Sequence, residues 1–305
     1  MAANNDAWPE LPLDAWQETY DTLHMWTQIV GKIRMTLTPL INHWWNVPLY
    51  VCARGLATSP IPYGQRIFEM RFDFISHKLV IETSDGGRKS LDLEPRSVAD
   101  FYRELMATLG SLGIDVQIHT TPDEFPNPIP FDQDHVHKSY DPIFAARFWR
   151  LLISVDTVLK NFRTRFIGKC SPVHFFWGSF DIAVTRFSGR LAPPRPDLIQ
   201  EEAYSHECIS AGFWPGGGEI KGPAFYSYTA PEPQGLKTYP IRPPQALYRT
   251  GVSEFILLYD DIRNQTSPEF AIMEFLQSTY EAGANLAKWD RAALERSSGS
   301  AATRG

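Results

Sequence analysis

The sequence predicts an α+β protein built from long helices and antiparallel strands. Apolar residues at helical spacing mark residues 14–37 and 144–166 as long helices. Residues 67–74 alternate apolar and charged side chains, as a strand does when one of its faces lies in a core. The order helix, strands, helix then occurs twice. We therefore expect two helix–antiparallel sheet–helix halves, related by an approximate two-fold axis, with a pocket between or within the sheets.

The first half is expected at residues 13–119, after an N-terminal lead at residues 1–12. Its first helix is predicted to open at Asp14, with Gln17 in capping-box spacing, and to end before Pro39. A second helix is expected to begin at Ser97. Strands are predicted at 67–74, 78–83, 89–94 and 115–119, the middle two as a hairpin around a DGG turn.

A Pro-rich linker at residues 120–143 separates the halves, because so many prolines exclude regular structure. The second half is expected at residues 144–290, followed by a flexible tail at 291–305. Its closing helix is predicted to start at Ser267 and Pro268. The apolar side of that helix is expected to carry Phe270, Met273, Leu276 and Tyr280, and strands are predicted at 180–187, 206–213, 224–229 and 255–260.

A His-aromatic-aromatic motif follows each of the two long helices. The first is His43-Trp44-Trp45 and leads to Arg54, and the second is His174-Phe175-Phe176 and leads to Arg186. Their equivalent positions indicate an internal duplication, although the spacing between His and Arg slips by one residue.

Composition narrows the classes of function. The formal net charge of −6 offers no basic field for nucleic acid, so nucleic-acid binding is excluded. No apolar run approaches the ~20 residues of a membrane span, and the N-terminus lacks the features of a signal peptide. Three widely spaced cysteines favour reduced thiols in the cytoplasm. Nine tryptophans favour a ligand-facing surface and leave a homo-oligomeric interface open.

Several sequence blocks together resemble a bacterial protein family of unknown function. The resemblance runs from about Trp8 to Leu294 and implies a single-family bacterial protein without accessory domains. It implies no activity and no site residue. The blocks are TLHMWTQIVGKIR (22–34), NHWWNVPLYV (42–51), GKCSPVHFFWGSFDIAVTRFSGR (168–190), EAYSHE (202–207) and GFWPGGG (212–218).

The first helix carries His24, Gln28 and Lys32 one turn apart from each other. Such a stripe is often an exposed face. Here Met25 and Trp26 flank it and leave little clean polar surface, so we expect His24 and Gln28 to face a cavity between the halves and to bind a ligand.

The linker offers a pair of candidate metal ligands. His135 and His137 share one face of an extended segment, which suits two ligands on one divalent metal ion such as zinc or iron. The alternative is a solvated loop, since no spacing matches an established metal motif.

The second half offers candidate catalytic residues. His174, His206 and Glu207 lie near predicted strand starts, where an imidazole with a carboxylate partner can act as a general base. Both histidines can equally be hydrogen-bonded core residues. The ligand-binding residues expected here are Trp177 and Trp214 as pocket walls and Arg186 as an anchor for a carboxylate, although structural ion pairs are the commoner use of arginine.

These observations favour an enzyme that acts on a small organic molecule in an aromatic-lined pocket, with histidine and glutamate as acid–base groups. A dependence on metal is left open. The alternative is a non-catalytic binding protein for an apolar or aromatic ligand. Convergence of polar histidines favours the enzyme, because a carrier of apolar ligands needs few buried titratable groups.

Overall fold

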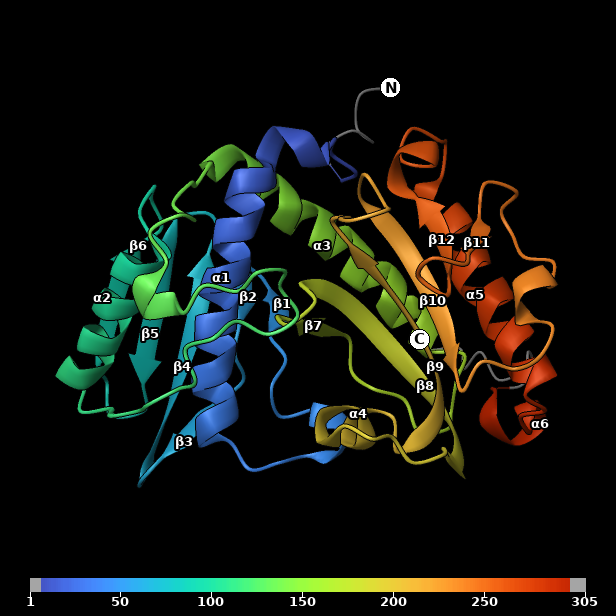
Figure 1. Cartoon of the computed structure of the whole chain (residues 1–305), viewed down its shortest axis with the longest axis horizontal. Coiled ribbons are helices and arrows are strands. Elements are labelled where there is room, and N and C mark those ends of the chain that lie inside the picture. Colours follow the sequence, from blue (N-terminus) through green and yellow to red (C-terminus); the bar gives the residue numbers. More distant parts are fainter. Residues whose placement is uncertain (1–6, 297–305) are drawn as a thin grey trace, which may run out of the picture. The chain divides into compact units, whose positions relative to one another are not determined.

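The structure is a computed structural model that describes residues 7–296 (Figure 1). It divides into two compact units. The first unit contains the chain up to Ile153 together with the segment His174–Asp181, and the second contains Ser154–Val173 together with the chain from Ile182. Helix α3, at Pro142–Arg163, carries the chain from one unit into the other. The expected α+β class is confirmed, because both units combine helices with antiparallel sheet.

The first unit contains an antiparallel sheet in the order β1-β2-β4-β5-β6, with β3 paired to β4. Helices α1 and α2 pack against each other, and they contact the sheet at β3 and β6 respectively (Figure 1). The elements are α1 Leu13–Leu37, η1 Asn42–Trp44, β1 Tyr50–Cys52, β2 Gly55–Ala57, β3 Ile61–Tyr63, β4 Arg66–Asp73, β5 Lys78–Thr83, β6 Arg88–Asp92, α2 Val98–Ser111, η2 Phe131–Gln133 and β7 His174–Phe176.

The second unit contains an antiparallel sheet in which the order runs β11-β12-β10-β9-β8. Helix α5 packs on strands β9 and β10. The elements are β8 Asp181–Leu191, α4 Leu198–Ala203, β9 His206–Trp214, β10 Ala224–Ala230, η3 Leu236–Thr238, β11 Leu247–Arg249, β12 Glu254–Leu258, η4 Tyr259–Asp261, α5 Pro268–Leu286 and α6 Arg291–Leu294.

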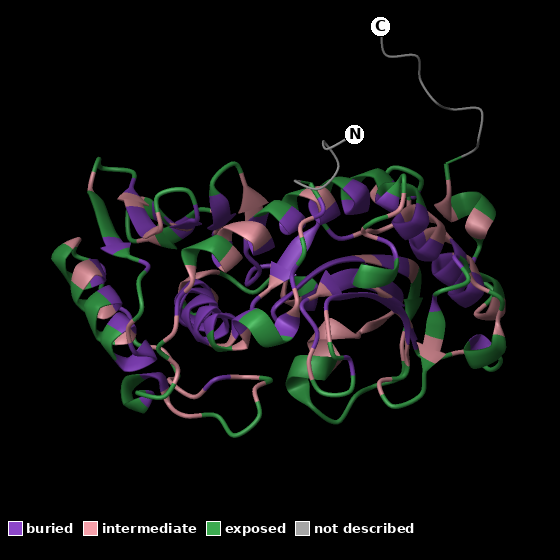
Figure 2. Cartoon of the chain, turned by 90° about the horizontal axis from the view of Figure 1, so that it is seen from above, coloured by how far each residue is buried: buried purple, intermediate pink, exposed green. Residues whose placement is uncertain are grey.

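Helix α1 is the central element of the first unit, because it is buried on nearly all sides (Figure 2). Ordinary amphipathic helices bury one stripe and leave the opposite face in water. In α1 the polar residues His24, Gln28 and Lys32 are buried as completely as the apolar Trp26 and Ile29. No helix among residues 7–296 is long and apolar enough to cross a membrane.

Most predicted elements are present. The structure confirms the strand at 67–74, the hairpin, the start of a helix at Ser97 and the four strands of the second half. Ser97 caps α2 by accepting a hydrogen bond from the backbone N–H of Asp100. The expected internal repeat, its two-fold axis and the residue bounds of the two halves remain predictions.

Three details are wrong. Residues 115–119 alternate in burial as a strand does. They form no strand, because no described strand lies beside them to pair with their backbone. Asp14 lies inside the first turn of α1, and the helix begins one residue after Pro12. Phe270 is 64% exposed, because the buried stripe of α5 is rotated onto Ile272, Phe275 and Leu276.

We predict that Gly31→Ala lowers the free energy of unfolding by about 2–3 kcal/mol, an overpacking cost. A Cβ atom at Gly31 in α1 meets the indole Nε1 of Trp177 at 2.2 Å. The matched control is Gly110→Ala in α2, where a Cβ meets nothing within 4 Å. That substitution is expected to stabilise by about 0.5–1 kcal/mol, as alanine does in an exposed helix. Urea denaturation measures both, and equal effects contradict the packing argument.

Candidate functional site

The predicted stripe on α1 is buried and holds two loops of the first unit. Gln28 binds the backbone of Asp123 in both directions, accepting from its N–H at 2.8 Å and donating to its carbonyl at 2.7 Å. Lys32 forms an ion pair with the carboxylate of Asp123 at 2.8 Å. The Nε2 of His24 lies 2.8 Å from the carbonyl of Gly178. These side chains therefore fix the linker and the turn after β7, and their role toward a ligand remains a prediction.

The protonation state of His24 follows from its surroundings. Burial lowers the pKa of His24 to about 4, so the ring is neutral at physiological pH. Because a carbonyl only accepts, Nε2 must carry the proton and donate it to Gly178. Gln28 Nε2 lies 3.1 Å from the same nitrogen, which in this tautomer cannot accept a hydrogen bond from it. His24 is thus a structural hydrogen-bond donor in this state.

Trp177 lies in the core of the first unit, where it is 5% exposed. Its indole Nε1 donates to the carbonyl of Val47 at 3.0 Å, and its ring covers the bare Cα of Gly31. The predicted partner in the pocket wall, Trp214, is half-buried at the end of β9 in the second unit.

The two predicted metal ligands have different surroundings. His135 is exposed, whereas the Nδ1 of His137 lies 2.6 Å from a buried carboxylate oxygen of Asp134. That carboxylate raises the pKa of His137 and favours its protonated form, which competes with metal binding. Across the part of the chain that the structure describes, no three His, Cys, Asp or Glu side chains gather in a way that could hold a metal ion.

His206 and Glu207 begin strand β9 in the second unit, whereas His174 belongs to the first. The Nδ1 of His206 lies 3.1 Å from the Ser205 hydroxyl. Glu207 accepts from Arg190 at 2.6 and 2.9 Å. Arg190 also donates to the carbonyl of Ala287, directly after α5. Glu207 therefore has a structural role in the second unit, and a site shared with His174 remains a prediction.

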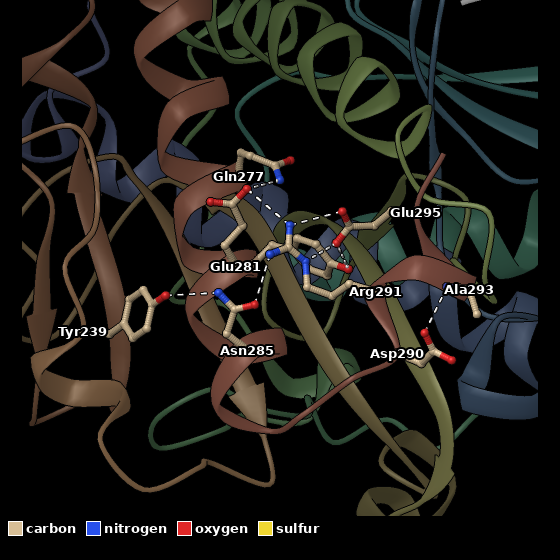
Figure 3. Close-up of polar contacts among 9 residues, drawn as sticks. Tyr239, Gln277, Glu281, Asn285, Asp290, Arg291, Ala293 and Glu295 are labelled. Atoms are coloured by element: carbon tan, nitrogen blue, oxygen red, sulfur yellow. Dashed lines mark hydrogen bonds and ion pairs between the residues drawn. The ribbon is translucent and has the colours of Figure 1, made fainter. Parts of the chain in front are cut away.

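Arg186 is enclosed by aromatic rings in the second unit and is 1% exposed. Its guanidinium carbon lies 3.4 Å from the ring centre of Phe162 and 4.3 Å from that of Tyr280. One guanidinium N–H donates to the carbonyl of Phe162 at 2.5 Å. Burial lowers the pKa of Arg186 to about 10. The nearby Glu295 accepts hydrogen bonds from Arg291 (Figure 3). It also accepts one from the Tyr280 hydroxyl.

The two His-aromatic-aromatic motifs come together in the first unit. Backbone hydrogen bonds in both directions join Leu49 to Phe175. The ring of His174 then lies 6.1 Å from that of Trp45 and 5.5 Å from that of Tyr50. We call the resulting group the His43–His174 cluster; its members are Arg34, His43, Trp45, Tyr50, His174 and Phe176.

The cluster combines a buried polar floor with partly exposed rings. Arg34, His43 and His174 are at most 5% exposed, whereas Trp45, Tyr50 and Phe176 are of intermediate exposure. The Tyr50 hydroxyl lies 3.4 Å from His174 Nε2, a distance that is long for a hydrogen bond. A phenol and an imidazole at this separation can exchange a proton once a bound molecule draws them together.

The backbone beneath the cluster is strained. His43 and Trp44 both have φ angles of 59°, in the left-handed region that non-glycine residues rarely adopt. The turn is held by Asn46, whose carbonyl accepts from Arg34 Nε at 2.6 Å and whose side chain donates to Thr38. Such strain persists only where the surroundings enforce it, and it concentrates at functional sites.

A separate groove of about 590 Å³ lies between α2 and the extended segment 114–118. It contains none of the predicted site residues. Its lining comes from Ala99, Tyr102, Arg103, Met106, Gly110, Ile114, Asp115, Val116, Gln117, Ile118 and Asp132.

The sequence predicted a functional role for His174 but not for the other members of the cluster. The available signal was the paired motif itself, since His43 and Trp45 occupy the positions equivalent to His174 and Phe176. Arg34 and Tyr50 gave no such signal, because a basic last helical turn and a strand tyrosine are ordinary features.

Comparison with known proteins matches the chain to a protein family. A model described as a family of unknown function (DUF5996) matches residues 8–296, which confirms the resemblance to a family of that kind. Neither the curated proteins nor the solved structures contain a match to the chain.

We predict that Arg186→Ala costs about 3 kcal/mol of unfolding free energy, because it empties a stacked aromatic site. Arg186→Met refills that volume without a charge and is expected to cost less than half as much. Arg249→Ala, at an exposed position of β11, serves as the control with an effect within about 0.5 kcal/mol. A loss for Arg186→Met as large as that for Arg186→Ala contradicts a packing role.

We predict a pH-dependent gain in stability for Glu254→Gln. Burial raises the pKa of Glu254 to about 7 from an ordinary value of 4.5. A raised carboxyl pKa means that the folded state binds the proton more tightly, so wild-type stability falls as pH rises from about 4.5 through 7. The variant lacks this loss and is expected to gain about 2 kcal/mol over wild type between pH 5 and 8. For the exposed control Glu94→Gln, the difference in unfolding free energy from wild type should not change with pH. A pH-independent difference for Glu254→Gln contradicts the argument.

Proposed function

This chain belongs to DUF5996, a family of unknown function, and we propose that it is an enzyme acting on a small organic molecule at the His43–His174 cluster. The observation that carries the proposal is a set of partly exposed aromatic rings above buried titratable groups, on a strained turn. Aromatic walls with a few convergent polar groups are typical of small-molecule sites.

In this proposal His174 and Tyr50 transfer a proton to or from the bound molecule. Neutral imidazole has one nitrogen that accepts and one that donates, and a phenol does both. The rings of Trp45 and Phe176, at 6.1 and 5.5 Å from His174, exclude water and orient an apolar or aromatic substrate. Metal dependence is not required by the groups in the cluster.

The alternative is a non-catalytic protein that binds an apolar or aromatic ligand at the same cluster. It is favoured by the three partly exposed rings of Trp45, Tyr50 and Phe176, which give more apolar area than a proton transfer requires. We also propose a bacterial source and a cytoplasmic location, which is consistent with three free cysteines. A homo-oligomer is proposed as well, and light scattering tests it.

We predict that His174→Gln reduces turnover at least 100-fold and that Tyr50→Phe reduces it at least 10-fold, the ordinary range for a lost acid–base group. The assay incubates the protein with a mixture of aromatic and aliphatic acids, amides and alcohols, and follows their consumption by mass spectrometry. Native mass spectrometry of the purified protein reports any retained ligand or metal.

Exposed His119→Gln is the matched control and should retain full activity. Full turnover in His174→Gln contradicts the enzyme proposal. A ligand retained at the cluster without turnover supports the binding protein instead. Circular dichroism confirms that each variant is folded, which separates loss of function from loss of structure.

A further inference from the structure

Three cations are buried in the part of the chain that the structure describes: Lys32, Arg34 and Arg186. A buried charge normally has a partner of opposite charge or another compensating contact. Lys32 has the carboxylate of Asp123 at 2.8 Å. Arg186 lies within aromatic rings that stack on its guanidinium. Lys32 is therefore compensated by a carboxylate and Arg186 by stacked rings, although the Nε of Arg186 has no hydrogen-bond acceptor.

Arg34 differs from the other two. It is 3% exposed, and its Nε is bound to the carbonyl of Asn46. Its Nη1 is buried without a hydrogen-bond acceptor, and no carboxylate of residues 7–296 lies within ion-pair distance of it. Burial lowers the pKa of Arg34, while the neighbouring Tyr50 raises it. The guanidinium nevertheless stays charged, because its ordinary pKa is above 12.

The position of Arg34 connects this charge to the cluster. Its guanidinium carbon lies 5.6 Å from the ring centre of Tyr50. The Tyr50 hydroxyl in turn lies 3.4 Å from His174 Nε2. A molecule that contacts Tyr50 and His174 is therefore close to a guanidinium whose Nη1 has no hydrogen-bond acceptor.

We propose that the His43–His174 cluster binds an organic carboxylate, with the carboxylate on Arg34 and an apolar or aromatic body against Trp45, Tyr50 and Phe176. This inference rests on the proposed function and names the class of its substrate. A planar guanidinium matches a planar carboxylate through parallel N–H···O bonds. With Nε bound to Asn46, Nη1 of Arg34 still has N–H groups to donate to one carboxylate.

The test compares benzoate with benzamide, its neutral analogue of nearly the same shape, by isothermal titration calorimetry. Wild type is expected to bind benzoate at least 10-fold more tightly than benzamide. Arg34→Met should reduce this preference to near parity while retaining weak binding of benzamide. The matched control is Arg96→Met, which removes a largely buried arginine of the same unit that has its own partner, Glu104. It should keep the full preference.

Two results overturn the carboxylate inference alone: equal affinity for both probes in wild type, or an undiminished preference in Arg34→Met. In either case binding that is lost in Trp45→Ala still supports the proposed site. If wild type binds neither probe and no other tested molecule, the proposed function itself fails. Should Arg34→Met fail to fold, Arg34→Lys and the wild-type ratio of the two affinities decide the question.

Discussion

The contact between Trp177 and Gly31 is the constraint on which the first unit depends. Residues 174–181 come late in the sequence, yet they pack within a unit built from the first 153 residues. The indole fits there because Gly31 has no side chain, and its N–H is satisfied by Val47. With Trp177 in place, Phe175 pairs with Leu49, and His174 reaches the rings of the first motif.

This arrangement explains why α1 carries polar residues on a face that is fully buried. His24, Gln28 and Lys32 each bind the backbone or the carboxylate of a loop that packs against the helix. These three buried side chains therefore each have a partner, as the cost of burial requires. Arg34 of the same helix binds Asn46 and so helps to hold the strained turn at His43 and Trp44. A freely moving loop would relax that strain.

Sequence alone predicted the helices and strands well, because periodicity and turn residues are local signals. It failed at residues 115–119, where the local pattern is that of a strand but pairing depends on a neighbour far along the chain. The candidate site was predictable only in part. His174 stood out through its motif. Tyr50 joins the site through the contact with His174 that the insertion of residues 174–181 creates, and Arg34 joins it through its contact with Tyr50. No pattern in the sequence reports such an insertion.

The most direct measurement is a crystal structure of the protein after soaking with 4-bromobenzoate. The anomalous signal of bromine locates the ligand. The account predicts a bromine peak beside Trp45 and Phe176, with the carboxylate of the ligand bound to Arg34. It is contradicted if bromine appears only in the groove along α2, or if an ordered protein carboxylate occupies Arg34 and the cluster holds no ligand.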